Sequence, residues 1–394
     1  MSRALLNVTA ARIGLRAGHV PSTYNRQPCI HSIHLRLKGD LPCGIHVARR
    51  SIGQTAMAQA HAGGAELLVL SGREAPELKE LTNLPDGMRL LATGRPGQEL
   101  ADWSKEDWGR VEVLLKCGTG KDASTKQELQ DIWPHLTNLK WIHSASAGVE
   151  KLLFPELIKS KVSVTNAKGA YSHSLAEWAL TACSWFAKDL PRLKQQQKDR
   201  NWEPYYVEEL RGKVLGVVGY GDIGQETANL ARAFKMSIIA LRRRKELSQH
   251  DKDLNLKIYT PDQLNELMAE SDYIVAALPH TDKTEKLVNA AAINSMKRTG
   301  VFVNIGRGQT VDEEALVKAL QDKRIRGAGL DVTYTEPLPK ENPLWDLDNV
   351  LLSPHTADRT TTFQAEAIQQ FTDLAKLYVQ GKELYNVVDK EIGY

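Results

Sequence analysis

An apolar run that ends in a glycine-rich loop is the feature that most constrains this chain. Lys213–Gly224 reads KVLGVVGYGDIG, and its glycines Gly219, Gly221 and Gly224 fit the spacing G-x-G-x-x-G. The run before the loop has the character of a strand buried on both faces, and Ile223–Phe234 has the pattern of an amphipathic helix. In such a strand, turn and helix, the glycines permit a tight turn, close approach to a pyrophosphate and close packing of helix on strand. The segment predicts a dinucleotide-binding unit; a glycine-rich turn without a cofactor is the weaker alternative.

Three arginines follow the second strand expected in this unit. Ser237–Leu241 runs directly into Arg242, Arg243 and Arg244, with no acid before Glu246. A carboxylate at this position would bind the ribose 2′-hydroxyl of NAD, whereas an arginine pairs with a 2′-phosphate. The arginines predict that NADP(H) is preferred and NAD(H) is possible. An ordinary solvated turn is the alternative.

Short apolar runs alternate with longer amphipathic ones from about Ala65 onward, which predicts parallel strands separated by helices. In the first half we expect strands at Ala65–Ser71, Arg89–Thr93, Val111–Lys116, Leu139–His143 and Val162–Thr165, with helices at Lys126–Leu136 and Val149–Ser160. In the second half we expect strands at Val214–Gly219, Ser237–Leu241, Leu256–Tyr259, Tyr273–Leu278, Val301–Ile305, Gly327–Val332 and Val350–Ser353.

A chain of 394 residues is too long for one ordinary core, so two domains are expected. Ser174–Gln197 has the spacing of one long helix that could connect them, with Pro191 as a kink or the start of a second segment. Thr361–Gln380 is expected to form a last long helix. The pattern predicts an α/β fold of two doubly wound parallel-sheet domains, Rossmann-like or flavodoxin-like, with a cleft between them.

Three polar residues, Arg307, Glu336 and His355, each come just after one of the last three expected strands. Ligands of an open α/β sheet bind beyond the carboxyl ends of its strands. Arginine suits a substrate carboxylate because it binds it bidentately, and histidine suits a general acid because it titrates near neutrality. Glu336 could orient the imidazole and favour its protonated form. Each residue alone would more often be structural, but together with the glycine loop they predict reduction of a 2-keto acid.

Six segments together resemble the D-isomer-specific 2-hydroxyacid dehydrogenase family over about residues 65–380. They are Ser146–Val149, Leu175–Glu177, the GYGDIG loop, Asn304–Leu316, Gly329–Pro339 and Leu351–Ala357. The resemblance implies that Arg307 binds the substrate, that His355 is the acid/base and that Glu336 is its carboxylate partner. It implies a backbone cradle for the substrate carboxylate at Ala147, Gly148 and Val149. It also implies cofactor contacts at Gly219, Tyr220, Gly221, Asp222, Ile223, Gly224, Arg242, Arg243, Leu278, Pro279, Ile305, Gly306 and Asp331.

The same resemblance implies a domain organisation and an assembly. A catalytic domain would comprise residues 65–170 and 359–394, with a cofactor domain inserted at 171–358. Family members are usually dimers. Arginine after the second strand resembles the glyoxylate/hydroxypyruvate reductase branch, so we expect an NADPH-preferring reductase acting on a small 2-keto acid, or a D-2-hydroxyacid dehydrogenase in the reverse direction.

Two alternatives stay open. One is a D-lactate or aromatic 2-keto acid reductase of the same family. The other is a non-catalytic, NAD(P)H-sensing interaction protein of the corepressor type. The sequence also departs from the family at Asp358, where glycine is usual; a carboxylate there could raise the pKa of His355 or point to solvent. His173 and Trp178 are weaker candidates for lining the site.

The first sixty residues are rich in arginine and contain one acid, Asp40. Leu5, Leu6, Val8 and Ile13 could form an apolar stripe beside the basic residues. This composition is typical of an organelle-targeting leader, so residues 1–60 are expected to direct the chain to the mitochondrion, with the plastid or cytoplasm as alternatives. A basic extension without function is the other interpretation.

Composition restricts the partners further. The net charge of +3 gives no reason to expect a nucleic-acid partner, and no apolar run is long enough to suggest a membrane span. The four cysteines form no CxxC pair, so we expect neither a metal site nor a disulfide framework.

Overall fold

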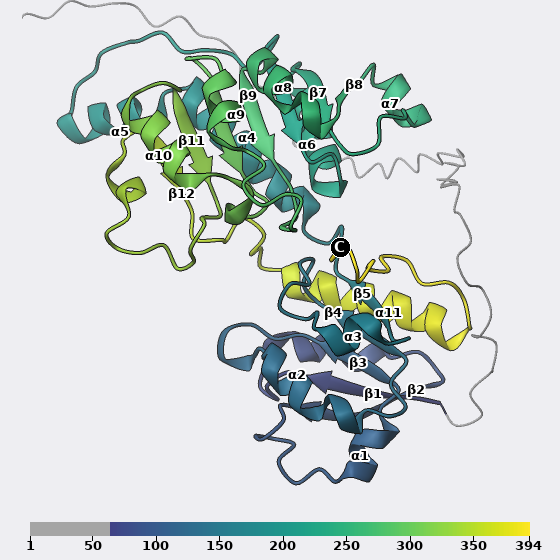
Figure 1. Cartoon of the computed structure of the whole chain (residues 1–394). Helices are drawn as coiled ribbons and strands as arrows, with labels where there is room; N and C mark the ends of the chain where they lie inside the picture. The colour runs from purple at the N-terminus through teal and green to yellow at the C-terminus, as the bar shows by residue number, and fades with distance from the viewer. Residues whose placement is uncertain (1–63) are drawn as a thin grey trace, which may run out of the picture. The chain divides into compact units, whose positions relative to one another are not determined.

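The computed structural model describes residues 64–394, and Figure 1 shows their strands and helices. These residues belong to one compact unit. The expected leader at residues 1–60 lies outside the described residues, as do Cys29 and Cys43. Within residues 64–394, no helix is long and apolar enough to cross a membrane.

Five parallel strands form the first sheet, in the order β2-β1-β3-β4-β5. They are β1 (Ala65–Leu70), β2 (Met88–Gly94), β3 (Val113–Lys116), β4 (Trp141–Ser144) and β5 (Ser163–Asn166). This is the flavodoxin-like strand order. Strands β1 and β3 are almost entirely buried, as expected for parallel strands that are covered on both faces.

Short helices and the last helix of the chain cover this sheet. They are η1 (Pro76–Asn83), α1 (Lys105–Arg110), η2 (Gly120–Asp122), α2 (Lys126–Ile132), η3 (Trp133–His135), α3 (Pro155–Lys159) and α11 (Phe363–Val379). Helix α11, yellow in Figure 1, lies beside the sheet, and Phe371 and Leu374 are buried in one cluster with residues of β1 and β3. The Tyr378 hydroxyl donates a 2.7 Å hydrogen bond to Glu112, the residue before β3. The chain therefore returns to its first sheet after completing the second.

Seven parallel strands form the second sheet, in the order β12-β11-β10-β9-β6-β7-β8. They are β6 (Val214–Val218), β7 (Ser237–Leu241), β8 (Lys257–Tyr259), β9 (Tyr273–Ala276), β10 (Val301–Asn304), β11 (Gly327–Leu330) and β12 (Val350–Leu352). The order extends the Rossmann arrangement by one strand. Its direction reverses between β6 and β9, which is where open α/β sheets bind their ligands.

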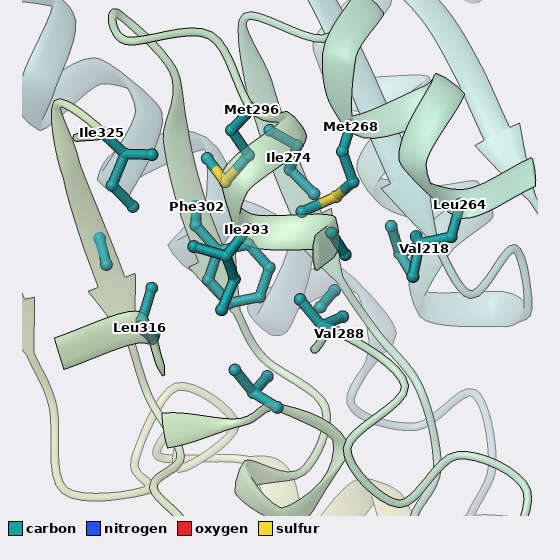
Figure 2. Packing of buried hydrophobic residues seen from close by; sticks show 14 of the residues in the cluster. Val218, Leu264, Met268, Ile274, Val288, Ile293, Met296, Phe302, Leu316 and Ile325 are labelled. Atoms are coloured by element: carbon teal, nitrogen blue, oxygen red, sulfur yellow. The ribbon is translucent and has the colours of Figure 1, made fainter. Parts of the chain in front are cut away.

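Helices connect the strands of the second sheet, and several of them pack on its two faces. They are α4 (Ser172–Ala187), α5 (Leu190–Asp199), α6 (Asp222–Ala233), α7 (Gln249–Asp253), η4 (Pro261–Gln263), α8 (Leu264–Glu270), α9 (Ala290–Ser295), η5 (Gly308–Thr310), α10 (Glu313–Gln321) and η6 (Pro343–Asp346). Phe302 of β10 lies at the centre of the cluster on one face, among Ile293, Met296 and Leu316 (Figure 2). The other face packs against α4 and α6, whose Ala179 and Ala228 are buried there. The predicted fold class, two α/β parallel sheets, is confirmed.

The structure decides two predicted helices. The segment Ser174–Gln197 forms two helices, which is the alternative in which Pro191 starts a second segment, because Asp189 adopts a left-handed backbone with φ 49° and Pro191 lies in the first turn of α5. The helix expected at Val149–Ser160 is reduced to α3, which begins at Pro155 because proline lacks the N–H that an interior position requires. The domain boundaries at residues 171 and 358 remain a prediction.

Candidate active site

The three glycines of the loop after β6 have three different surroundings. Gly219 has φ +101°, and a Cβ there would lie 2.8 Å from the carbonyl oxygen of Ala277. A Cβ on Gly224 would collide with the carbonyl oxygen of Gly219, so this glycine permits α6 to pack closely on β6. A Cβ on Gly221 would meet no protein atom within 4 Å. The backbone at Gly221 therefore faces open space, as a loop that accommodates a pyrophosphate requires.

Helix α6 begins at Asp222 directly after this open glycine. Gly221 is its N-cap residue, and no side chain caps the helix. The first turn of a helix has N–H groups without intrahelical partners, and its dipole favours negative charge. The donors present thus fit a dinucleotide phosphate at this position. Tyr220 is buried and its backbone N–H donates to Leu241, which holds the loop against the end of β7.

The arginines after β7 divide into two kinds. Arg242 is largely buried, and its Nη2 lies 2.7 Å from Oδ2 of Asp251, a carboxylate that is itself almost fully buried. Its Nε also donates to the carbonyl oxygen of Arg244 at 2.9 Å. Arg242 therefore shapes the turn after β7. Arg243 and Arg244 are exposed on that turn, and the guanidinium of Arg243 lies over the ring of Tyr394, 5.2 Å from its centroid, a contact that leaves its N–H groups to a phosphate.

His355 and Glu336 lie together, as predicted. The Nδ1 atom of His355 lies 2.8 Å from Oε2 of Glu336, and Oε1 of Glu336 accepts a 3.2 Å hydrogen bond from the backbone N–H of Thr333. With Nδ1 engaged by the carboxylate, Nε2 is the nitrogen that remains for a reacting group. The arrangement resembles an oriented acid/base pair in which the carboxylate fixes both tautomer and ring direction.

The pair shifts both pKa values in the direction that keeps it charged. The hydrogen bond that His355 donates to Glu336 raises the pKa of His355 above its ordinary value, while burial and the charge of Arg307 oppose this. Burial alone would raise the pKa of Glu336, but the hydrogen bond and charge of His355 dominate, so the pKa of Glu336 is lowered. His355 therefore holds a proton on its imidazole at a pH where an isolated histidine would begin to lose it.

Asp331, at the end of β11, fixes the loop that carries His355. Its Oδ1 accepts hydrogen bonds from the backbone N–H groups of Thr356 at 2.9 Å and Ala357 at 3.1 Å, and from the Ser353 hydroxyl. The carbonyl oxygen of Asp331 accepts from the N–H of His355, whose φ is +51°. The other carboxylate oxygen, Oδ2, is buried and has no partner among the described residues. A buried acceptor without a donor fits a ligand amide, such as the carboxamide of a nicotinamide.

Arg307 extends from the loop after β10. Its carbonyl oxygen accepts from Asn304 at 3.1 Å and from the Thr310 hydroxyl at 2.7 Å, so its backbone is held from both sides. Its Nη1 donates to the carbonyl oxygen of Gly306 at 2.8 Å, and its Nε lies 3.1 Å from Oε1 of Glu150. Asn304, Thr310 and Glu150 were not among the predicted site residues.

The loop after β4 supplies the other wall of this site. A Cβ on Gly148 would collide with Nη2 of Arg307, so the guanidinium rests directly on this glycine. The structure thus brings Arg307 to the Ala147–Val149 segment, although the two are distant in sequence. Val149 itself points into the core of the first sheet and is buried, so only its backbone is available to a ligand. Asn166 on β5 donates a 2.6 Å hydrogen bond to the carbonyl oxygen of Ala147, which fixes the loop.

The loops after β9 and β10 pack tightly against each other. A Cβ on Gly306 would lie 2.6 Å from the carbonyl oxygen of Leu278, and both Leu278 and Ile305 are buried. The carbonyl oxygen of Pro279 accepts a 2.6 Å hydrogen bond from Thr284. These residues therefore lie beside the glycine loop and close one side of the site.

Asp222, at the first position of α6, forms a 3.2 Å ion pair with Lys168.

The two weaker candidates for lining the site, His173 and Trp178, lie in different surroundings. A pocket of about 120 Å³ is lined by His173, Ser174, Glu177 and Asp358, among others. Burial raises the pKa of Asp358 and the charge of His355 lowers it, while the charges that act most on His355 are those of Glu336, Arg307 and Asp331. The side chain of Trp178 packs in the core beside α4. His173 therefore lies near this site in a pocket, whereas Trp178 is structural.

Comparison with known proteins identifies the chain's relatives. Residues 180–357 match the model of the D-isomer specific 2-hydroxyacid dehydrogenase, NAD binding domain. A glyoxylate reductase from Thermofilum pendens is 34% identical over 286 residues, which are 68% of this chain and 81% of that protein. A D-3-phosphoglycerate dehydrogenase from Methanocaldococcus jannaschii is 33% identical over 76% of this chain and 55% of its own length.

A solved structure agrees with these relatives. A D-isomer specific 2-hydroxyacid dehydrogenase from Xanthobacter autotrophicus Py2, in complex with NADPH and MES, superimposes with a TM-score of 0.70. It is 26% identical, and the match covers 84% of this chain and all of that one. The chain therefore belongs to the D-isomer specific 2-hydroxyacid dehydrogenase family, and it is an oxidoreductase with an NAD(P)-binding domain.

Proposed function

We propose that this protein reduces small 2-keto acids, glyoxylate and hydroxypyruvate foremost, with NADPH as the preferred hydride donor. The observation that carries the proposal is the set formed by Arg307 on Gly148 and by the hydrogen-bonded pair His355 and Glu336. The glyoxylate reductase from Thermofilum pendens, of which this chain covers 81%, supports the choice of substrate.

Each residue of the set has a task in this reaction. Arg307 binds the substrate carboxylate, and the backbone of Ala147 and Gly148 closes around it. Asp331, with a carboxylate oxygen that is unpartnered among the described residues, would hold the nicotinamide of the cofactor, which when bound would supply the hydride to the carbonyl carbon of the substrate. Negative charge then grows on the carbonyl oxygen of the substrate, and Nε2 of His355 donates a proton to it. Glu336 stabilises the charged imidazole before transfer and keeps its ring oriented.

The preference for NADPH is supported by the exposed arginines after β7 and by the NADPH bound to the related Xanthobacter enzyme. In this proposal Arg243 and Arg244 pair with the 2′-phosphate, while Arg242, engaged by Asp251, holds the turn that presents them. Two arginines without a buried partner can offer several N–H donors to a phosphate, whereas a carboxylate at the end of β7 would repel it.

The experiment is an absorbance assay of NADPH and NADH oxidation with glyoxylate, hydroxypyruvate, pyruvate and phenylpyruvate. Rapid turnover of the first two with NADPH supports the proposal. Faster turnover of pyruvate or phenylpyruvate would replace it with a D-lactate or aromatic 2-keto acid reductase. Cofactor binding without turnover of any of the four would favour a non-catalytic sensor.

We also propose that the enzyme is a homodimer and that residues 1–60 direct it to the mitochondrion. The dimer follows from the assembly that the sequence resemblance implies, and the leader is supported by its arginine-rich, acid-poor composition. Sedimentation at the mass of a single chain would contradict the homodimer. A fluorescent protein fused after residues 1–60 tests the second, because cytoplasmic or plastid fluorescence would contradict it.

A further inference from the structure

Glu150 is the one carboxylate of the described residues that pairs with Arg307, and it follows directly after the Ala147–Val149 segment. Its Oε1 lies 3.1 Å from Nε of Arg307. Its Oε2 lies 2.6 Å from the point where a Cβ on Gly148 would stand, and Nη2 of Arg307 crowds the same point. The carboxylate of Glu150 thus lies against the guanidinium of Arg307 and against Gly148. The proposed function assigns these same two groups to the carboxylate of the substrate.

The hydrogen-bonding capacity of Arg307 shows what a substrate would meet. Of its five N–H groups, the Nε–H is directed to Glu150 and one on Nη1 to the carbonyl oxygen of Gly306. A bidentate carboxylate needs two parallel donors on one edge of the guanidinium. The edge that carries Nε and Nη2 is therefore shared with Glu150, and a substrate that uses it must move Glu150 away.

The ion pair between Arg307 and Glu150 is exposed enough for a substrate carboxylate to displace Glu150. The side chains of Arg307 and Glu150 are 30% and 37% exposed, so a displaced carboxylate can move into water. Ion pairs of this exposure are weak, which makes Glu150 a modest competitor and not a permanent block. It also places a negative charge against Arg307, the cation whose charge lowers the pKa of Glu336 and opposes protonation of His355.

We propose that Glu150 is a specificity-determining residue that competes with the substrate carboxylate for Arg307 and selects singly charged 2-keto acids over doubly charged ones. The inference rests on the proposed function and names its substrate class. A keto acid with one carboxylate replaces Glu150 at Arg307 at little cost. A second anionic group on the substrate lies near the displaced Glu150, whose negative charge repels it.

The experiment compares Glu150→Gln with the wild-type chain and with Glu156→Gln. Glutamine keeps the size of the side chain and removes its charge. Glu156 is an exposed glutamate on α3, a few residues further on, so its variant controls for the loss of one negative charge in the same segment. We measure KM and kcat for glyoxylate, which carries one negative charge, and for oxaloacetate, which carries two, with NADPH at saturation.

We expect Glu150→Gln to lower KM for glyoxylate by roughly three- to fivefold, the size of a partly exposed ion pair, with kcat within about twofold. For oxaloacetate the fall in KM should be on the order of tenfold or more, because a charge repulsion is also removed. Glu156→Gln should change neither. An unchanged KM, or a raised KM with a large loss of kcat, would overturn the proposal, because Glu150 would then only hold Arg307 in place.

Binding of unreactive analogues separates this inference from the proposed function. Oxamate and oxalate carry one and two negative charges, and their dissociation constants from the protein with NADPH bound can be followed by tryptophan fluorescence. Tighter binding of both to Glu150→Gln, with the larger gain for oxalate, supports the role of Glu150 even if no keto acid is turned over. Equal binding to variant and wild type contradicts it even if glyoxylate is a good substrate.

Discussion

The Nδ1 atom of His355 lies 2.8 Å from Oε2 of Glu336, and the two side chains shift each other's pKa in opposite directions. A histidine whose pKa is raised holds its proton to higher pH, and a glutamate whose pKa is lowered stays ionised to lower pH. The pair therefore keeps its charged form over a wider pH range than either group alone. That form is the one that a proton-donating step requires.

This relationship predicts how the rate depends on pH. The kcat/KM for glyoxylate reduction should be constant at low pH and fall as pH rises through the pKa of His355, which lies above its ordinary 6.5. In Glu336→Gln the carboxylate that raises this pKa is gone, so the fall should begin at lower pH, together with a lower plateau. A profile whose midpoint does not move in the variant would show that another group titrates.

Replacement of His355 tests the proton donor. We expect His355→Ala to lower kcat by about 10²- to 10⁴-fold, the usual contribution of a general acid, while the dissociation constant for NADPH stays within about twofold. His135→Ala, in the short helix η3, is the control for losing a histidine elsewhere. Comparable kcat in both variants would remove His355 from the mechanism.

The glycine loop allows folding and cofactor binding to be separated. Because a Cβ on Gly221 meets no protein atom within 4 Å, Gly221→Ala should leave the melting temperature unchanged but weaken NADPH binding by roughly tenfold or more. Gly224→Ala forces a methyl group into the carbonyl of Gly219 and should cost about 1–3 kcal/mol of stability. Thermal unfolding and fluorescence titration report the two effects. Tight NADPH binding by Gly221→Ala would place the pyrophosphate elsewhere.

Cofactor choice is predicted to depend on Arg243. Arg243→Glu removes a charge-assisted hydrogen bond to the 2′-phosphate, so the dissociation constant for NADPH should rise by about 10- to 100-fold while that for NADH changes little. Arg298→Glu, an exposed arginine after α9, is the matched control for the same change of charge. If both cofactors are affected alike, the proposed contact is absent.

Arg242 should behave differently from its neighbour. Its removal in Arg242→Ala leaves the buried carboxylate of Asp251 without its cation, and we expect a loss of about 1–3 kcal/mol in the free energy of unfolding. The exposed Arg244→Ala should cost almost nothing by comparison. Urea unfolding measures both. Equal stabilities would show that the Arg242–Asp251 contact contributes nothing.

Features with a local sequence signal were predictable. The strand, turn and helix around Gly219 lie within one short segment, and the structure gives each glycine the surroundings that its role requires. The hydrogen bond between Glu336 and His355 was expected because both residues follow strands of one sheet, whose carboxyl ends meet at one edge. Most strands begin and end within a few residues of their predicted positions for the same reason.

Contacts between distant segments were not predictable in this way. Arg307 and Glu150 are separated by 157 residues. No hydrophobic periodicity or motif spacing in the sequence predicts that they are in contact. The pairing of Arg242 with Asp251 was missed because a run of three arginines gives no sign of which one is buried. An acid placed immediately after the Ala147–Val149 segment is, in retrospect, the one sequence signal that could have singled out Glu150.

The return of α11 to the first sheet has a consequence for synthesis of the chain. Phe371, Leu374 and Tyr378 cover apolar residues of β1 and β3 that leave the ribosome long before them. Every strand of the second sheet is translated in between, so that sheet can be completed while the first still exposes one apolar face. A nascent chain halted shortly before Phe363 would carry the completed second sheet and a first sheet with one apolar face uncovered, and exposed apolar surface of this kind is prone to aggregation.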